Sequence, residues 1–288
     1  MELRQIRHFM AVAETGSFTK ASERVSISQP ALSASIAKLE DELQVRLLDR
    51  TRAKVVTTVA GQRLRERAGS ILSACSAIKA ELKSGDAPQP LRIGVLRTLS
   101  THPIANLIAG YRRLRPGASF VLYEGPAEEL RARLREHKVD AILTRIDTPS
   151  KDVRTRELFS ERFVVSAPMD HHLATRDQIE LSDLNGESYI SRTACEMADT
   201  TTALLKERRI RFRVTYRTDQ DERALALVAA GVGVTVAPEL FRAPGVKQIE
   251  LSDCPVQRII GLQWFKSGET DEVTQFISIA EQHDWMAR

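Results

Sequence analysis

Motifs for catalysis and metal binding are what this 288-residue sequence most clearly lacks. It contains no phosphate-binding GxxxxGK loop, no GxSxG nucleophile turn, no HExxH pair and no CxxC pair. The glycines of AAGVGV come after a predicted helix and before a predicted strand, the reverse of a dinucleotide-binding fingerprint. We therefore expect no metal and no cofactor.

Cysteines and long hydrophobic runs are also scarce. The three cysteines, Cys75, Cys195 and Cys254, are far apart, which suits a reducing compartment. No stretch approaches the ~18 apolar residues of a membrane span, and the first residues, MELRQIRHF, lack a signal-peptide core. These features predict a cytoplasmic protein with no membrane partner.

The positive charge is confined to one part of the chain. Residues 1–90 hold 14 Lys and Arg against 10 Asp and Glu, whereas residues 91–288 hold 28 of each. The whole net charge of +4 therefore lies in the first third, where it would favour contact with phosphates.

Residues 16–43 predict two helices joined by a tight turn. The first spans 19–25, and Ser28 can cap a second helix over 29–43, with Pro30 in its first turn. Leu32, Ile36, Leu39 and Leu43 form an apolar stripe on that second helix. The opposite face holds Pro30, Ser33, Ala34 and Ala37.

A face of small residues at the start of a helix suits close approach to a DNA groove, as in a helix-turn-helix. An ordinary helical hairpin within a core is the alternative. A helix over 2–14 precedes this pair, and two short strands follow it, with Leu47 and Leu48 in the first and Val55, Thr57 and Val59 in the second. Their basic turn predicts either a DNA-contacting wing or a solvated hairpin.

A long helix over 60–83 comes next. Leu64, Ala68, Ile71, Cys75, Ile78 and Leu82 step along it by alternating four and three residues, a heptad seam. A small winged domain cannot bury that stripe, so we predict a dimerisation helix. Residues 84–90, SGDAPQP, then form a hinge linker.

Beyond the linker, strands alternate with helices. Strands at 91–96, 119–125 and 139–144 with helices at 104–114 and 127–136 make a βαβαβ unit, which requires a parallel sheet. A second unit has strands at 163–168, 189–193, 212–218 and 233–238 and helices at 200–209 and 221–230. The last strand, 258–265, and a helix over 271–285 return to the first unit. We expect lobe I at about 91–163 and 262–288, and lobe II at about 164–261.

Residues 3–64 resemble the N-terminal winged helix-turn-helix of the LysR-type transcriptional regulators. The likeness runs through FMAVAETGSFTKAS, SISQPALSASIAKLE, LLDR and TTVAG. EGPAEELRARLREHKVDAIL, HHLA and LALVAAGVGVTVAP resemble the effector domain of that family, which is two-lobed and periplasmic-binding-protein-like (type 2). The chain departs from the family pattern at Ala34 and Ala37, where basic residues are common, at Gln44, where Gly is common, and at Val59.

The resemblance implies an α+β multi-domain fold: a winged helix-turn-helix (1–59), a linker helix (60–83), a hinge (84–90) and an effector-binding domain (91–288). It also implies a bacterial regulator that forms homodimers and homotetramers on interrupted inverted repeats of double-stranded DNA. A small molecule between the lobes would control DNA binding or bending. The rival hypothesis is an enzyme with a catalytic cleft, which the N-terminal domain merely localises.

Two sets of site residues follow from these patterns. For DNA we predict contacts from the recognition helix and the wing: Ser28, Gln29, Pro30, Ser33, Lys38, Arg50, Arg52 and Lys54. For the effector, the three hydroxyls in RTLSTHP and an arginine across the cleft predict a small organic anion, in particular a carboxylate. The predicted effector residues are Arg97, Thr98, Ser100, Thr101, Thr144, Ser191, Arg192, Thr193, Val232 and Gly233.

Two further groups are candidates for chemistry. His171 and His172 are adjacent, so we expect a surface turn and not two ligands of one site. Cys195 and Cys254 could form an oxidant-sensing pair, although Arg192 is the only basic residue close to either that could activate a thiolate.

Overall fold

The computed structural model describes residues 1–50, 54–84, 90–147 and 153–287. Contacts divide the chain into two compact units, Met1–Gln89 with Arg135–Lys138, and Pro90–Leu134 with Val139–Arg288. Each unit has its own buried core. No helix in the described ranges combines the length and hydropathy needed to span a bilayer.

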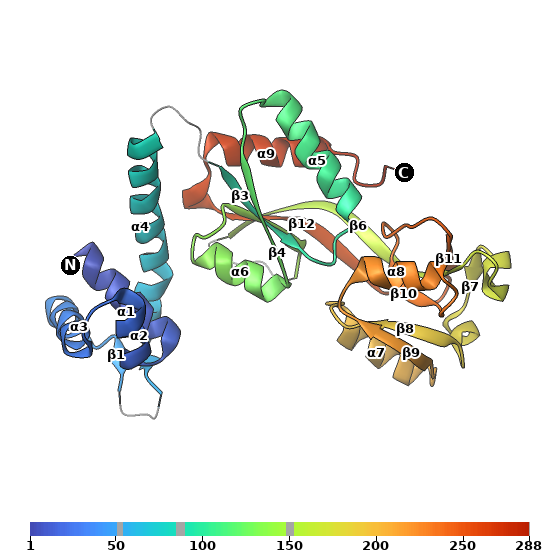
Figure 1. Ribbon diagram of the computed structural model, residues 1–288, viewed down its shortest axis with the longest axis horizontal. Helices are drawn as coiled ribbons and strands as arrows, with labels where there is room; N and C mark the ends of the chain where they lie inside the picture. The colour runs from blue at the N-terminus through green and yellow to red at the C-terminus, as the bar shows by residue number, and fades with distance from the viewer. Residues whose placement is uncertain (51–53, 85–89, 148–152, 288) are drawn as a thin grey trace. The chain divides into compact units, whose positions relative to one another are not determined.

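Three helices form the N-terminal part of the first unit: α1 (Leu3–Thr15), α2 (Phe18–Val25) and α3 (Gln29–Leu43) (Figure 1). The Ser17 side chain accepts a hydrogen bond from Lys20 N, and Ser28 accepts one from Ala31 N, so each serine caps the helix that follows it. The predicted pair of helices and the Ser28 cap are confirmed.

Helix α3 ends with Gln44 as its C-cap, at a position where the family commonly has glycine. Gln44 adopts the left-handed conformation (φ 53°), which side chains other than glycine rarely take. Its own amide Nε2 donates a hydrogen bond to Asp41 O (2.6 Å), a carbonyl in the last turn that also accepts from Gln44 N (3.2 Å). This contact compensates for part of the backbone cost.

The core of the first unit lies among α1, α2, α3 and the start of the next helix. Leu32, Ile36 and Leu39 of the predicted stripe are fully buried in it. Leu43, which we expected to continue the stripe, is 36% exposed, so that part of the prediction is wrong. It is the last residue of α3, beyond the neighbours that cover the earlier turns.

Two short strands form the wing, β1 (Leu48–Asp49) and β2 (Val56–Thr57), paired antiparallel. Val59, predicted to lie in the second strand, instead begins helix α4 (Val59–Ser84) and is exposed. Thr58 causes this change because its hydroxyl accepts a hydrogen bond from Gly61 N (3.0 Å) and donates one to Arg46 O (2.7 Å). The threonine thereby starts the helix.

The first half of helix α4 packs against the core of its own domain. Ala68 is fully buried in the core of the first unit, and Leu64 and Ile71 pack against that core. The first half of the predicted seam is therefore covered by the chain's own domain, and the prediction that the seam needs a partner helix is wrong for that half. Further along, Cys75 is half-buried and Ile78 is 54% exposed, while the Leu82 side chain lies outside the described residues.

The first lobe of the second unit contains the predicted parallel strands β3 (Leu91–Leu96), β4 (Phe120–Gly125) and β5 (Ala141–Arg145). Figure 1 shows α5 (Thr101–Leu114) and α9 (Asp271–Gln282) on one face of this sheet and α6 (Ala127–Arg135) on the other. The chain moves one way across the sheet from β3 to β4 and the opposite way from β4 to β5. Because crossovers between parallel strands are right-handed, their helices α5 and α6 lie on opposite faces. β12 (Gln257–Phe265) joins the sheet antiparallel to β5.

A single long strand, β6 (Val153–Pro168), runs into both lobes. Its first part pairs with β12, and its last part pairs with β10 (Thr235–Pro238) and β11 (Val246–Leu251). The sequence predicted only residues 163–168 as a strand, because residues 153–162 are rich in charge and show no apolar run. β11 and the short β7 (Gln178–Ile179) were not predicted.

The second lobe adds a two-stranded parallel sheet, β8 (Ser188–Arg192) with β9 (Arg213–Thr218). Helices α7 (Ala198–Glu207) and α8 (Asp221–Ala229) follow β8 and β9 respectively, and the 3₁₀ turns η1 (His172–Thr175) and η2 (Leu181–Leu184) precede β8; a third, η3 (Lys266–Gly268), follows β12. Gly233 allows β10 to approach β8, since a Cβ there would lie 2.4 Å from Ser188 O.

Candidate functional site

The exposed face of α3 is made of small and uncharged residues. Gln29, Pro30, Ala34 and Ala37 are all exposed, and Ser33 is half-buried. The Gln29 side chain accepts a hydrogen bond from Thr19 Oγ1 (3.3 Å), which links it to α2. This face is the one that sequence reasoning assigned to a DNA groove.

Glu40 organises the junction between α3 and the wing, and sequence reasoning missed it. Its carboxylate is buried and accepts hydrogen bonds from Leu47 N (2.7 Å) and Leu48 N (3.1 Å). The same carboxylate pairs with Arg46 and Arg50, each at 3.3 Å. One acid on α3 therefore fixes the start of β1 and positions two cations of the wing.

The basic residues predicted to contact DNA have different surroundings. Arg50 is held against α3: besides Glu40, it donates to Ser33 Oγ (3.4 Å) and its guanidinium lies 4.8 Å from the Phe18 ring centroid. Lys38 is exposed and lies 3.9 Å from a Glu2 oxygen. Lys54 is exposed and passes over Gly16. Arg52 lies outside the described residues.

A buried network of polar groups centres on Arg258 of β12. Its guanidinium contacts Glu161 (2.7 Å), the Glu196 carboxylate, Thr98 Oγ1 (3.1 Å) and Thr98 O (2.8 Å). Thr98 in turn donates its hydroxyl proton to Glu196 Oε2 (2.7 Å). Glu196, from the loop after β8, is thus joined to the segment after β3, and we call these contacts the Glu196 network.

The electrostatics of this network favour an ionised Glu196. Burial raises the pKa of that carboxyl, but the Arg258 charge and the hydrogen bonds from Thr98 and Arg258 outweigh burial and leave the pKa lowered. Burial dominates at Glu161, where the pKa is raised despite the same arginine. Arg145 adds a hydrogen bond to Glu196 O (3.4 Å).

Two other predicted effector residues are also held by carboxylates of lobe II. Thr101, the first residue of α5, donates to Glu222 Oε1 (2.9 Å). Arg192 is buried and pairs through Nε with Asp221 Oδ1 (2.6 Å). Asp221 and Glu222 lie in the first turn of α8, so the start of this one helix contacts both Thr101 and Arg192.

The remaining predicted effector residues have fewer contacts. Thr144 is fully buried, and within the described residues its hydroxyl has no hydrogen-bond partner. Ser100 precedes α5 without a side-chain cap bond. Ser191 is half-buried. Three further residues of the predicted set are exposed: Arg97, Thr193 and Val232.

Sequence reasoning missed the residues that hold this set together, Glu161, Glu196 and Arg258. One signal was present. Arg258 is the only charged residue in the mostly apolar stretch RIIGLQWF, and a charged residue buried in such a strand needs a partner. The partners themselves carried no signal, because Glu161 and Glu196 are distant in sequence.

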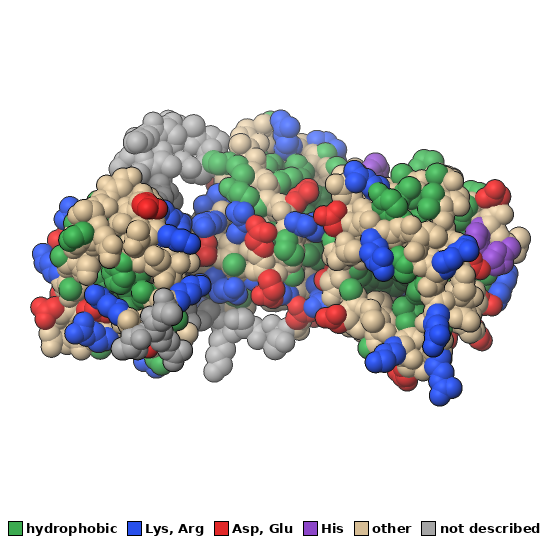
Figure 2. Space-filling model, turned by 60° about the horizontal axis from the view of Figure 1, so that its bottom comes forward, with side chains coloured by type: hydrophobic (Ala, Val, Ile, Leu, Met, Phe, Trp, Pro, Cys, Tyr) green, Lys and Arg blue, Asp and Glu red, His purple; other side chains and the backbone are tan. Residues whose placement is uncertain are grey.

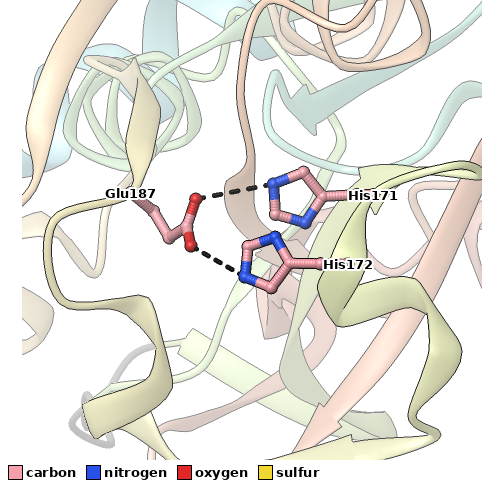
Figure 3. Close-up of side chains that lie close together, drawn as sticks. All are labelled: His171, His172 and Glu187. Atoms are coloured by element: carbon pink, nitrogen blue, oxygen red, sulfur yellow. Dashed lines mark ion pairs between the residues drawn. The ribbon is translucent and has the colours of Figure 1, made fainter.

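The adjacent histidines meet at one carboxylate (Figure 3). The predicted surface turn is confirmed, because His171 caps η1 and His172 is exposed at its start. His171 Nε2 lies 3.5 Å and His172 Nε2 3.1 Å from the two oxygens of Glu187, so the two rings point to one place, which we did not expect. These three residues have the composition of a metal site. However, Leu173 N donates to His171 Nδ1 (3.3 Å), which places the proton of the neutral ring on Nε2, the atom a metal would need.

Comparison with known proteins places both units in one family. Residues 3–62 match the bacterial regulatory helix-turn-helix protein model of the lysR family, and residues 84–285 match the LysR substrate binding domain. The regulator YybE of Bacillus subtilis is 30% identical over 92% of this chain and 93% of its own length. The Escherichia coli dual regulator OxyR is 30% identical over 86% of this chain and 82% of its own length.

Solved structures agree with this assignment. A full-length OxyR variant from Pseudomonas aeruginosa superposes with a TM-score of 0.65 at 27% identity, covering 100% of this chain and 99% of its own. Full-length BenM gives a TM-score of 0.58 at 26% identity, covering 98% and 96%. The chain therefore belongs to the LysR family of bacterial DNA-binding transcriptional regulators, with an N-terminal helix-turn-helix and a two-lobed effector-binding domain.

Proposed function

We propose that a small organic anion, a carboxylate, controls how this regulator binds or bends promoter DNA by competing for the Glu196 network between the lobes. In this proposal the regulator acts in the bacterial cytoplasm, where the DNA is. It reads an interrupted inverted repeat as a homodimer or homotetramer and has no catalytic role. The proposed site comprises the predicted effector residues around Thr98 and Thr101, with Arg258 added.

The observation that carries the proposal is that this place already holds a carboxylate. Thr98 supplies a hydroxyl and Arg258 supplies Nη1 of its guanidinium to Glu196, while the Nε and Nη2 of Arg258 hold Glu161. Thr101 supplies a second hydroxyl to Glu222. Thr98 and Thr101 are hydroxyls that sequence reasoning assigned to a bound anion, whereas the arginine is Arg258 and not the predicted Arg192. Both carboxylates belong to lobe II, and both accept from residues at or just before the start of α5.

The same contacts supply a mechanism. An external carboxylate on Thr98 and Arg258 would displace Glu196, which begins the segment leading into α7. The lobes would then lose one of the contacts that join them, and a second arrangement would gain population. Only a difference in affinity between the two arrangements can pass this change to the DNA-binding unit.

The experiment compares Glu196→Gln with the wild-type protein. Gln keeps a hydrogen bond to Thr98 but removes the internal charge, so a competing small carboxylate should bind the variant severalfold more tightly. A thermal-shift screen of small carboxylates would identify the ligand. Gel shifts on the DNA upstream of the protein's own reading frame would then report the response.

The matched control is Asp199→Asn, which removes an exposed carboxylate nearby on α7. We expect it to bind carboxylates as the wild type does. Equal affinities for wild type, Glu196→Gln and Asp199→Asn would show that the anion does not compete with Glu196. A screen in which no carboxylate binds would also refute the proposal.

A second candidate function is a response to peroxide. Relatives named hydrogen peroxide-inducible genes activators, such as that of Dickeya chrysanthemi, are 32% identical over 83% of this chain and 80% of their own length. In this chain Cys195 and Cys254 are free and pack against the same cluster of Phe163, Met197 and Val256. That proximity favours the candidate, whereas burial raises the pKa of both thiols and so disfavours the reactive thiolate.

Alkylation by iodoacetamide across pH tests this second candidate. Burial raises the pKa of the Cys195 thiol, so we expect Cys195 to react more slowly than a free cysteine at pH 8 and to speed up only above the ordinary pKa of a thiol. Intact-mass measurement after one equivalent of hydrogen peroxide should then show both thiols unchanged. Rapid loss of two thiols at neutral pH would instead establish a peroxide response.

A further inference from the structure

A large cavity lies inside lobe II, apart from the Glu196 network. It has a volume of about 980 Å³ and opens between α7, the β8–β9 sheet and the segment that connects α7 to β9. Thr98, Thr101 and Arg258 do not line it. Of the ten residues predicted for the effector, only Ser191 and Arg192 do, so the structure divides that set between two places.

Helix α7 covers the cavity without filling it. None of its ten residues is buried. In the described part of the second unit, every other α-helix of eight or more residues buries at least two. Leu204 and Leu205 reach the lobe II core only in part. Protein interiors are close-packed, so an open space of this size beneath an amphipathic helix is a place for a ligand.

The walls of the cavity are mostly apolar. Tyr189 and Phe212 stack with ring centroids 4.2 Å apart and planes 10° apart, and both line the space. Phe163, Ile210 and Val236 add to the apolar surface. A ligand body that fits these walls is a flat ring or an alkyl chain.

The charge on the walls has one sign. Four cations line the cavity, Arg192, Lys206, Arg209 and Arg211, and no aspartate or glutamate does among the described residues. Lys206, Arg209 and Arg211 are exposed and form no ion pair with any described residue. Arg192 is buried with its Nη2 unpaired within the described chain. Figure 2 shows Lys and Arg side chains around hydrophobic ones on this part of the molecule.

We propose that this cavity is a second ligand site, for an apolar monocarboxylate whose body lies between α7 and the stacked pair and whose acid group meets Arg209 and Arg211. The site does not depend on the interlobe anion. A bound ligand would hold α7 against β8 and β9, and α7 begins two residues after Glu196. Occupancy of the cavity is thereby linked to the position of the Glu196 network.

The test uses the full-length protein with decanoate as the probe and 1-decanol as its uncharged counterpart. We expect decanoate to raise the unfolding midpoint and to bind measurably by isothermal titration calorimetry, and decanol to bind at least tenfold more weakly. The double variant Arg209→Gln, Arg211→Gln should weaken decanoate at least tenfold, because both side chains are exposed and their loss leaves the fold intact. Leu204→Trp should weaken decanoate by occupying the space beneath α7.

Arg217→Gln is the matched control, since Arg217 is an exposed cation of β9 that does not line the cavity. It should leave decanoate binding unchanged, as should Thr98→Val in the interlobe site. Failure of decanoate to bind at all would overturn the proposal. So would binding that survives both cavity variants, or binding that Thr98→Val abolishes while the cavity variants do not. Because the Glu196→Gln experiment reads a different site, either proposal can fail alone.

Discussion

At the scale of single residues, the important features of this regulator are charged groups whose partners are distant in the sequence. Glu40 looks like one more acidic residue near the end of α3, yet it binds two backbone N–H groups and two arginines. Glu196 likewise looks like a loop residue and is held by Thr98 and Arg258. A buried carboxylate is retained only where donors surround it, so each of these acids defines a junction.

Replacement of Glu40 by alanine should destabilise the first unit. The change leaves the N–H groups of Leu47 and Leu48 buried without acceptors, which costs roughly 2 to 4 kcal/mol. Chemical denaturation followed by circular dichroism measures the change in the free energy of unfolding. Asp41→Ala, on the neighbouring exposed position, is the control and should cost less than about 0.5 kcal/mol. Equal stability of the two variants would show that Glu40 is dispensable to the junction.

At the scale of elements, α3 separates its two roles by face. Leu32, Ile36 and Leu39 fix the helix in the core, while Gln29, Pro30, Ala34 and Ala37 stay exposed. Pro30, Ala34 and Ala37 have short side chains and only Gln29 among these four is long, so the helix backbone can approach a groove closely. Ala34 and Ala37 have no side-chain group that could contact a phosphate, so we expect recognition to depend more heavily on Gln29 and its neighbours.

Replacement of Gln29 by alanine should relax preference at one base pair in each half-site. A glutamine amide can make two hydrogen bonds to adenine in the major groove, and their loss costs about 1 to 3 kcal/mol on the preferred sequence. Fluorescence anisotropy on a set of single-base variants of the site measures this. A loss of equal size on every sequence would make Gln29 a positioning residue. Gln257→Ala, exposed in the second unit, should change nothing.

At the scale of the whole molecule, we expect α4 to decide how copies of the chain associate. Its first half is used by the core of its own domain through Ala68, Leu64 and Ile71. Ile78, two turns after Ile71, is left 54% exposed. An exposed isoleucine in a heptad pattern is a contact for a second helix.

Ile78→Asp should therefore weaken self-association at least tenfold without unfolding the monomer, because the side chain is already exposed. Analytical ultracentrifugation across concentration measures the change, and binding to a two-half-site DNA should fall more than binding to a single half-site. Val59→Asp places the same charge at another exposed position of α4 and is expected to leave association intact. Unchanged dimers in Ile78→Asp would move the interface elsewhere.

The sequence by itself determined the elements whose signals are local. The Ser28 cap, Pro30 in the first turn and the spacing of Leu32, Ile36 and Leu39 are short-range patterns, and they predicted α3 with its bounds. The alternation of apolar strands and helices after residue 90 predicted β3, β4 and β5 as a parallel set for the same reason. The family resemblance came from these contiguous stretches too.

Only the tertiary structure decided what depends on residues far apart in the chain. Thr98 meets Glu196 across 98 residues, and Arg258 meets Thr98 across 160. The sequence predicted that hydroxyls at the start of α5 would attract a carboxylate, but it could not show that the chain supplies its own. Sequence patterns report local periodicity and capping, whereas the partner of a buried charge and the space left beneath a helix are fixed only when the segments pack together.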